Sequence, residues 1–278
     1  MTVPRQHALS VDVEDWNEAF GRQGLPARLQ GTESRIEQAS DLLLELLERH
    51  RAKATCFVLG TVASRTPAVV RRIAAAGHRV GSHGWEHRCL DDSNPALLAR
   101  HLTESRKLLQ DLSGQPVLGF RAPWFSLRSR TAWAQAVIQE AGFTYDSSLF
   151  PVWNPFYGVS GAPLEVHRLP GGLHEVPPSA VELGPLRLPI AGGIYWRLLP
   201  FSWLNWGIDR LASLGRPAVL YLHPWELDTG QPRVWMGPMS TAIHYLNLSR
   251  TARVLESILG RWSFAPIEEV FPQVNSAA

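Results

Sequence analysis

Over its first 150 residues, the sequence alternates between short apolar runs typical of buried strands and longer segments with helical periodicity. The expected strands are HALSVDV (7–13), ATCFVLG (54–60), HRVGSH (78–83), PVLGFRAP (116–123) and FTYDSS (143–148). Helices are expected between them at 33–50, 66–77, 94–111 and 129–141. Repeated units of this kind pack as a parallel sheet covered by helices, either open or closed into a barrel.

From residue 151 to about 200 the alternation stops, and proline and glycine become frequent. We interpret this stretch as an irregular, β-rich insertion, because these residues favour turns and short strands. The alternation resumes with an expected helix at 201–214, a strand at 217–223, a helix at 247–260 and a last strand at 264–267. A chain of 278 residues has the usual size of one α/β barrel, so we expect residues 1–278 to form a single domain.

The composition indicates a folded protein with a substantial core. Hydrophobic residues make up 45% of the chain and charged residues 19%. The net charge is +2 without a block of like charge, so we expect no nucleic-acid partner. No apolar run approaches the roughly 18 residues of a membrane span, and the first residues do not resemble a secretory signal. Two cysteines, Cys56 and Cys89, are too few for a disulfide scaffold, which favours a cytoplasmic location.

Polar side chains gather where the expected strands end. They are Asp12, Glu14, Asp15, His83, His87, Arg121, Asp146 and His223. Each alone has an ordinary structural explanation, such as a helix cap, a turn or a surface ion pair. The carboxyl ends of parallel barrel strands share one face, which carries the active site in barrel enzymes, so their coincidence predicts a single site. Because His83 and His87 lie four residues apart, their imidazoles can converge on a transition metal.

These strand ends carry a set of motifs that resembles a known family. In order they are SVDVEDW (10–16), SHGWEH (82–87), RAPW (121–124), DSSLFP (146–151) and LYLHP (220–224). The order resembles the five motifs of the polysaccharide deacetylases, the NodB-homology or carbohydrate esterase family 4 fold. The resemblance implies a distorted (β/α) barrel with a divalent metal, most simply zinc, at its mouth.

A second group of stretches resembles one branch of that family. LPIAGGIYWRLLP (188–200), AVLYLHPWELD (218–228) and HYLNLSRT (244–251) resemble the branch found in bacterial exopolysaccharide clusters linked to exosortase systems. We therefore expect residues 151–278 to carry the branch-specific part of the domain.

The first motif departs from the usual family pattern of two adjacent aspartates. Its order Asp12-Val13-Glu14-Asp15 is similar to the Asp-x-Asp variant of the allantoinase-like and Helicobacter-type peptidoglycan deacetylases. Strand pleat puts Asp12 and Glu14 on the same side. We therefore assign Asp12 as the general base and Glu14 as the metal ligand, and Asp15 remains an alternative ligand if the strand turns before it.

The resemblance also implies roles for the other strand-end residues. His83, His87 and one carboxylate would hold the metal, and Arg121 would hold Asp12 in place. His223 would act as the general acid and Asp146 would orient it. The backbone N–H of Trp124 would stabilise the oxyanion. Trp85, Trp124 and Trp225 would bind substrate, since they adjoin the motifs, as Trp16 and Trp153 also do.

The function expected from these residues is N-deacetylation of an acetamido sugar in a bacterial exopolysaccharide or its lipid-linked precursor. The partner would be an acetylated saccharide, and the oligomeric state is left open. Two alternatives remain: an allantoinase-like cyclic-amide hydrolase, and a catalytically inactive saccharide-binding protein. A saccharide enzyme should expose aromatic side chains along a groove, whereas a cyclic-amide hydrolase should have a closed pocket.

Overall fold

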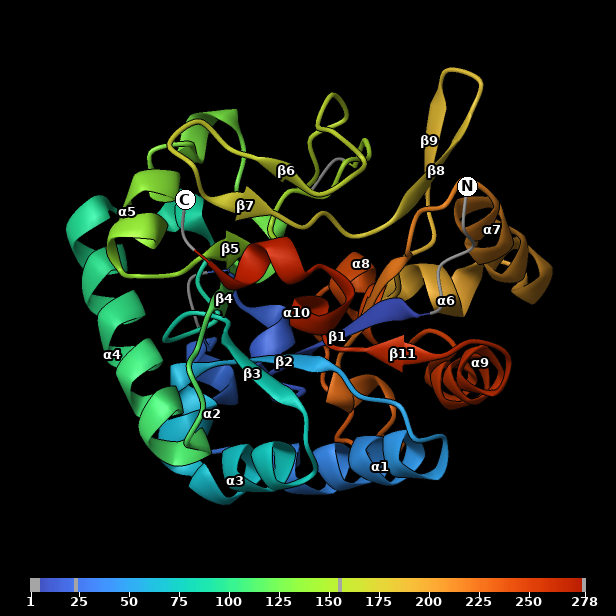
Figure 1. The fold of residues 1–278 in the computed structure, drawn as a ribbon. Coiled ribbons are helices and arrows are strands. Elements are labelled where there is room, and N and C mark those ends of the chain that lie inside the picture. The colour runs from blue at the N-terminus through green and yellow to red at the C-terminus, as the bar shows by residue number, and fades with distance from the viewer. Residues whose placement is uncertain (1–5, 23–24, 155–156, 277–278) are drawn as a thin grey trace.

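A curved, mainly parallel sheet forms the centre of the molecule (Figure 1). The structure, a computed structural model, describes residues 6–22, 25–154 and 157–276. Within these ranges the strands follow the order β10-β1-β2-β3-β4-β5-β7-β6, and β11 also pairs with β1. Their bounds are β1 (His7–Val13), β2 (Thr55–Val58), β3 (Arg79–Ser82), β4 (Gly119–Phe120), β5 (Tyr145–Asp146), β6 (His167–Arg168), β7 (His174–Glu175), β10 (Val219–Leu222) and β11 (Phe264–Ala265). Since only β6 and β7 pair in antiparallel fashion among these strands, the prediction of a parallel α/β fold is confirmed.

Helices surround this sheet, as expected for βα units (Figure 1). They are α1 (Ile36–Arg49), α2 (Gly60–Arg65), α3 (Pro67–Ala75), α4 (Pro95–Ser113), α5 (Ala134–Glu140), α6 (Ile194–Leu198), α7 (Phe201–Ser213), α8 (Pro238–Tyr245), α9 (Leu248–Arg261) and α10 (Ile267–Val270). On α1, buried Ile36, Leu43 and Leu47 recur at helical spacing and belong to the same core as Leu9 and Val11 of β1. The periodic apolar residues therefore attach the helices to the sheet.

The expected elements agree with the structure to within a few residues, and the differences have local causes. β1 has the predicted bounds, whereas β4 and β5 keep only two residues each. Four helices, α2, α6, α8 and α10, were not predicted, because helices of four to eight residues are too short to show a clear period. The helix expected at 129–141 is divided into a 3₁₀ turn at Ser129–Thr131 and α5.

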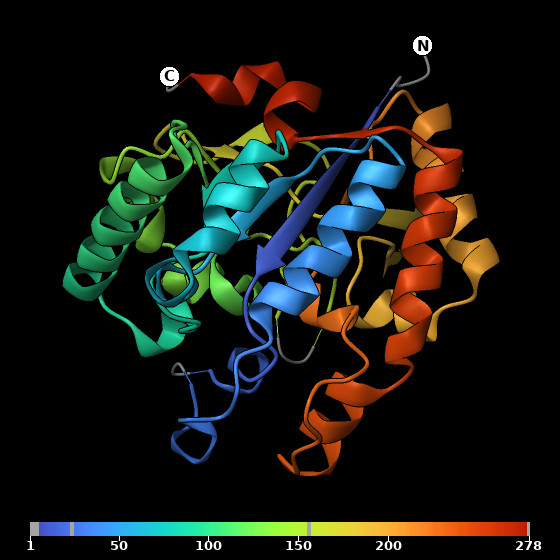
Figure 2. The ribbon, with the colours of Figure 1, turned by 90° about the horizontal axis from the view of Figure 1, so that it is seen from below.

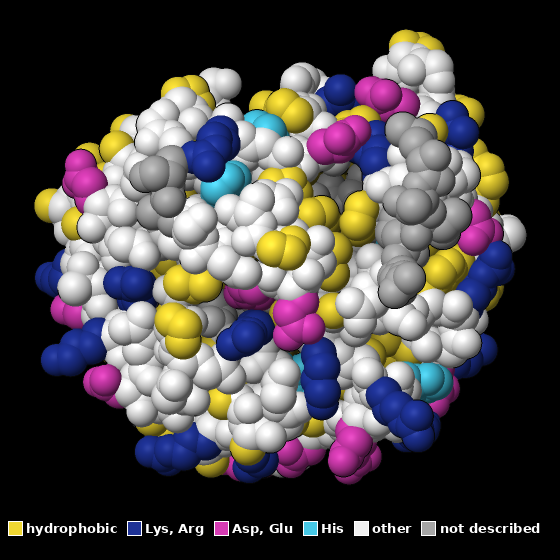
Figure 3. Space-filling model, in the orientation of Figure 1, with side chains coloured by type: hydrophobic (Ala, Val, Ile, Leu, Met, Phe, Trp, Pro, Cys, Tyr) yellow, Lys and Arg dark blue, Asp and Glu magenta, His cyan; other side chains and the backbone are white. Residues whose placement is uncertain are grey.

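The sheet stays partly open, so the barrel is distorted. Among the described residues, β6 at one end of the order does not pair with β10 at the other. The predicted β-rich insertion at 151–200 is confirmed, and it contains β6, β7 and a separate antiparallel hairpin of β8 (Ala180–Leu183) and β9 (Leu186–Pro189). This hairpin projects at the upper right of Figure 1, and Figure 3 shows apolar side chains at its tip, where Leu183 and Leu186 are exposed.

The carboxyl ends of β1, β2, β3 and β10 lie at one end of the sheet, because these strands are parallel. Figure 2 shows two segments projecting beyond this end: the segment that follows β1 and the segment that contains α8. The sheet thus presents the predicted strand-end residues between two projecting loops. Of the helices in the described part of the chain, none is both long and apolar enough to cross a bilayer.

Candidate active site

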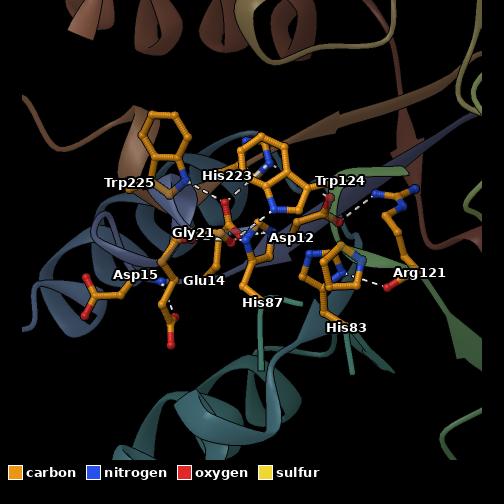
Figure 4. Close-up of polar contacts among 12 residues, drawn as sticks. Asp12, Glu14, Asp15, Gly21, His83, His87, Arg121, Trp124, His223 and Trp225 are labelled. Atoms are coloured by element: carbon orange, nitrogen blue, oxygen red, sulfur yellow. Dashed lines mark hydrogen bonds and ion pairs between the residues drawn. The ribbon is translucent and has the colours of Figure 1, made fainter. Parts of the chain in front are cut away.

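Six of the predicted residues meet at the carboxyl ends of the strands (Figure 4). They are Asp12, Glu14, His83, His87, Arg121 and His223, here called the site cluster. Asp12 lies on β1 and Glu14 follows it, the two histidines follow β3, Arg121 follows β4 and His223 follows β10. Parallel pairing brings these strand ends together, although the residues are up to 211 positions apart in the chain.

Backbone carbonyls hold both imidazoles of the His83–His87 pair in one tautomer. Nδ1 of His83 lies 2.8 Å from the carbonyl oxygen of Arg121, and Nδ1 of His87 lies 3.1 Å from that of Glu18. Because a carbonyl can only accept, each Nδ1 donates, and the Nε2 of each neutral ring keeps its lone pair. Burial lowers the pKa of His83 to about 4, which keeps that ring neutral. Histidine ligands of metals are commonly held in this way by their second nitrogen.

Glu14 completes a group that could hold a metal ion. One ligand atom each from Glu14, His83 and His87 lie within 4.8 Å of one another, and all three side chains are buried. Oε2 of Glu14 lies 2.7 Å from Nε2 of His87, and Oε1 accepts a hydrogen bond of 3.0 Å from the indole N–H of Trp225. Two imidazoles and a carboxylate are a donor set that suits zinc.

The electrostatics of this group favour a cation. Burial raises the pKa of Glu14, but the neighbouring histidines, His87 above all, more than offset it and bring the pKa below its usual range. Burial lowers the pKa of His87, and the charge and hydrogen bond of Glu14 outweigh it and raise that pKa. Glu14 thus draws positive charge to this point, either as a proton on Nε2 of His87 or as a metal ion bound there.

The alternative that Asp15 is a ligand is not supported by the structure. Oδ1 of Asp15 accepts the backbone N–H groups of Trp16, at 2.9 Å, and Arg35, at 3.2 Å. Figure 4 shows its carboxylate turned away from the two imidazoles. β1 ends at Val13, and the backbone N–H of Glu14 then donates to the carbonyl of Asp12 at 3.1 Å. The carboxylates of Asp12 and Glu14 both face Nε2 of His223, and that of Asp15 does not join them.

Asp12 is held by Arg121, as the resemblance implied. Nη1 of Arg121 lies 2.7 Å from Oδ1 of Asp12. The guanidinium is fully buried, donates to the carbonyl and hydroxyl oxygens of Ser147 and lies over the ring of Phe57 at 4.4 Å. The other carboxylate oxygen of Asp12, Oδ2, faces Nε2 of His223 at 3.9 Å. One oxygen is therefore anchored and the other points into the site cluster.

Glu226, which the sequence interpretation missed, orients His223. Its Oε1 lies 2.7 Å from Nδ1 of His223 and also accepts the backbone N–H of that residue at 3.2 Å. Its Oε2 lies 3.1 Å from Nε of the buried Arg197. Burial lowers the pKa of His223, but the hydrogen bond that His223 donates to Glu226 and the charges of Glu14, Glu226 and Asp12 raise it to about 9. The imidazolium therefore carries a proton on Nε2, directed toward Asp12 and Glu14.

Asp146 does not take the position predicted for it beside His223. Its carboxylate accepts the hydroxyl of Ser148 at 2.6 Å and shares a hydrogen bond with Glu175. It lies on β5, and β1 to β4 separate that strand from β10 in the open sheet. The partner of His223 comes instead from its own 3₁₀ turn, Pro224–Glu226. The sequence signal for this cap is Pro224 directly after His223 and an acidic residue, Glu226, three positions after it.

The tryptophans beside the motifs divide into buried and accessible side chains. Trp225 is only 6% exposed, stacks on His223 with ring centroids 5.2 Å apart, and donates to Glu14. Little of its surface is left for a substrate, and its role in substrate binding stays a prediction. Trp16 is buried as well. Trp124 and Trp85 are half-buried, and the Trp124 ring lies 5.4 Å from His87, so a contact with substrate stays a prediction for both.

Trp124 also has an unusual backbone. Its φ of 61° and the φ of 46° at Phe125 put two consecutive residues in the left-handed region, which L-residues rarely adopt. Its indole N–H donates to the carbonyl of Gly21 at 3.2 Å. Such conformations often occur at functional sites, and the oxyanion role of the Trp124 N–H stays a prediction.

Comparison with family models divides the chain into two matched parts. Residues 31–145 match the model described as polysaccharide deacetylase, and residues 147–272 match a model described as a domain of unknown function, DUF3473. Both parts contribute strands to the same sheet: β2, β3 and β4 come from the first part, and β6, β7, β10 and β11 come from the second.

Individual proteins extend this similarity. The chain is 29% identical over 159 residues to the peptidoglycan deacetylase of Helicobacter pylori, a match that covers 54% of this chain and 52% of that protein. It spans about half the length of the curated relatives it matches, or less. A solved structure from Mycobacterium smegmatis is described as a candidate polysaccharide deacetylase. Its alignment with this chain spans 97% of this chain and 91% of the solved one, at 21% identity and a TM-score of 0.63. The alignment with the structure of PuuE allantoinase spans 95% of this chain and 87% of the allantoinase chain, at 17% identity and a TM-score of 0.61. These two structures share the fold.

Proposed function

We propose that this chain, which contains a polysaccharide deacetylase domain, is a metal-dependent hydrolase that removes N-acetyl groups from acetamido sugars of a bacterial exopolysaccharide or its precursor. The observation that carries the proposal is the site cluster. It joins the candidate ligands Glu14, His83 and His87 to an anchored carboxylate, Asp12, and to a protonated imidazole, His223. Hydrolysis of an amide needs these three components: a metal or other electrophile, a base and an acid.

The residues present fit a divalent metal. Backbone carbonyls hold Nδ1 of both histidines, which leaves Nε2 of each as the candidate ligand atom, and the Glu14 carboxylate, which pairs with Nε2 of His87, draws positive charge to the same point. A bound zinc ion would lower the pKa of a water molecule and polarise the acetamide carbonyl. Zinc is the first choice for two imidazoles and a carboxylate, although iron and cobalt use similar ligands.

Asp12 is the proposed general base. Arg121 fixes one of its oxygens, so the other, Oδ2, is left to accept the proton of the attacking water. The water oxygen bonds to the acetyl carbon, and the carbonyl oxygen gains negative charge. A base that is already oriented avoids the entropy of finding this position during the reaction.

His223 is the proposed general acid. When the bond between the acetyl carbon and the nitrogen breaks, Nε2–H of His223 gives its proton to the departing amine, so the products are acetate and a free amino sugar. Glu226 holds Nδ1, which leaves Nε2 as the donor that faces the reacting atoms. The proton would then return from Asp12 through solvent.

Metal content and acetate release test the proposal together. The wild-type protein should contain about one divalent metal per chain and release acetate from an N-acetylated oligosaccharide. His83→Ala and His87→Ala should lose both the metal and the activity, whereas His167→Ala, on β6 outside the site cluster, should keep both. Metal and activity that survive in both ligand variants would contradict the assignment.

A panel of substrates separates the remaining alternatives. Exopolysaccharide fragments, peptidoglycan fragments and allantoin should be offered to the same preparation, because acetate release from the first two and ring opening of the third are measured independently. Ring opening without acetate release would favour the cyclic-amide hydrolase. Binding without any hydrolysis in a metal-loaded preparation would favour the inactive binding protein.

A cytoplasmic location is part of the same proposal. It is supported by Cys56 and Cys89, which are both buried and unpaired in the described structure. Cell fractionation with an antibody against the native protein tests it.

A further inference from the structure

A hollow of about 520 Å³ lies on the segment that contains α8, outside the site cluster. Its lining combines two aromatic rings, Trp235 and Tyr245, with three side chains that form hydrogen bonds, Arg233, Thr241 and Asn247. This segment projects beyond the carboxyl ends of the strands, at the same end of the sheet as the site cluster (Figure 2). No step proposed above uses the hollow.

The chemistry of the lining suits a sugar ring. Trp235 is 68% exposed, so its apolar face is open to solvent. The guanidinium of Arg233 lies over the Tyr245 ring at 5.6 Å, and within the described ranges no carboxylate pairs with it. An exposed aromatic face packs against the C–H face of a pyranose, and side-chain donors at its edge can bind the hydroxyl groups.

Two further side chains keep hydrogen-bonding capacity toward the hollow. The hydroxyl of Thr241 accepts the backbone N–H of Met236 at 2.9 Å, so its own proton can be donated. The amide nitrogen of Asn247 donates to the carbonyl of Arg197 at 3.2 Å, which leaves the amide oxygen as an acceptor. The lining therefore offers both donors and an acceptor, as a polyhydroxylated ligand requires.

A short column of rings joins the hollow to the proposed acid. Tyr245 follows His244, which stacks on Trp225 with centroids 4.2 Å apart, and Trp225 stacks on His223 at 5.2 Å. The hydroxyl of Tyr245 accepts the N–H of Val234 and donates to the carbonyl of Pro232, which fixes the loop carrying Trp235. Two stacked rings, His244 and Trp225, thus lie between Tyr245 of the hollow and His223.

We propose that this hollow is a binding subsite for a sugar unit of the polysaccharide, distant along the chain from the unit that is deacetylated. The proposal rests on the proposed function and deepens it, because it makes the substrate an oligomer or polymer rather than a monosaccharide. A contact far from the reacting group that is equally strong in the ground state and the transition state lowers KM for long chains and leaves kcat unchanged.

The length dependence of catalysis tests the subsite. Kinetics of acetate release should be compared for N-acetylated oligosaccharides of increasing length in the wild type, Trp235→Ala and a matched control, Trp206→Ala. Trp206 is also exposed, at 39%, but lies on α7 in a different hollow. In Trp235→Ala, KM should rise about threefold to tenfold for the long oligosaccharides, as loss of one aromatic contact implies. KM for the monosaccharide, and kcat for all lengths, should stay unchanged, and Trp206→Ala should match the wild type.

Binding provides a readout that does not depend on catalysis. Calorimetric titration of the same long oligosaccharides should show the same loss of affinity in Trp235→Ala, and Trp235→Phe should recover part of it if the ring itself is the contact. Equal affinities and equal KM values for the wild type and Trp235→Ala would overturn the subsite while leaving the proposed function intact. Absence of acetate release from every saccharide would instead overturn the proposed function, and the titration would still decide whether the hollow binds sugar.

Discussion

Replacing Glu226 by glutamine tests how the fold makes His223 a proton donor. Glutamine keeps the size of the side chain and an oxygen that can accept from Nδ1, but it removes the negative charge. It also removes the charge that faces Arg197 at 3.1 Å. Both effects disfavour the imidazolium form of His223. Because the side chain keeps its size, the variant tests the effect of the negative charge alone.

The magnitude follows from the strength of the lost contact. A hydrogen bond to a charged group contributes about 1.5–3 kcal/mol, and about 1.4 kcal/mol corresponds to one pKa unit. The pKa of His223, which is about 9 in the structure without a metal, should therefore fall by about one to two units. A bound cation would lower both starting and final values, because it disfavours a second positive charge nearby.

The sign of the pH dependence is then determined. The acid must be protonated, so activity is present below the pKa of His223 and is lost as the pH rises through it. In Glu226→Gln the alkaline limb of kcat/KM should move to lower pH by about one to two units. The acidic limb, which depends on other groups, should stay in place. Glu182→Gln, which changes an exposed glutamate that pairs with Arg187, is the matched control and should leave the whole profile unchanged.

The assay needs a check on folding. Arg197 is buried, and an unpaired buried charge costs about 3–5 kcal/mol, so thermal unfolding of each variant should be recorded. Adding Arg197→Met to Glu226→Gln removes the orphaned charge and should restore part of the lost stability. An alkaline limb that stays at the wild-type pH in a folded Glu226→Gln protein would refute the view that Glu226 charges His223.

Three further predictions concern the other residues of the site. Asp12→Asn should lower kcat by at least about 100-fold, the lower end for loss of a general base, with the metal content unchanged by elemental analysis; loss of metal would make Asp12 a ligand. Trp225→Phe keeps the stacked ring but removes the donor to Glu14, and should weaken metal affinity about 10-fold to 100-fold in a competition titration with a chelator; an unchanged affinity would leave the indole a packing residue only. Glu14→Gln should abolish metal binding and Asp15→Asn should not, and the reverse result would restore the Asp15 alternative.

The sequence predicted the features that depend on local geometry, namely strand bounds, side-chain directions and the spacing of the two histidines. The alternation of side chains along β1 predicted that Glu14, rather than Asp15, lies beside Asp12. In the structure the Glu14 carboxylate lies near His83, His87 and His223, and its role as a ligand stays a prediction. The spacing of His83 and His87 likewise gave two rings that face one point. Strand bounds were accurate where apolar runs were long, as in β1.

The rest depends on the degree of closure of the sheet, which the sequence does not encode locally. Asp146 ends β5 and His223 follows β10, but only a closed barrel would bring these two strands side by side. The burial of Trp225 could not be foreseen either, because its cover, His244, lies in the unpredicted helix α8. Glu226 was within reach of sequence reasoning, since it stands three residues after His223 in a recognisable cap.

The pairing of β1 with β10 along one edge and with β11 and β2 along the other has a consequence for how such a protein can evolve. The candidate ligands come from the amino-terminal half of the chain, but the proposed acid and the indole that holds Glu14 come from the carboxyl-terminal half. If the chain were cut near residue 146, the amino-terminal half would lose β10, which would expose one edge of β1. The Glu14 carboxylate would also lose the hydrogen bond from Trp225. Neither half is therefore a transferable module, and substitutions around Glu14 and Trp225 are expected to be inherited as matched sets across the two halves.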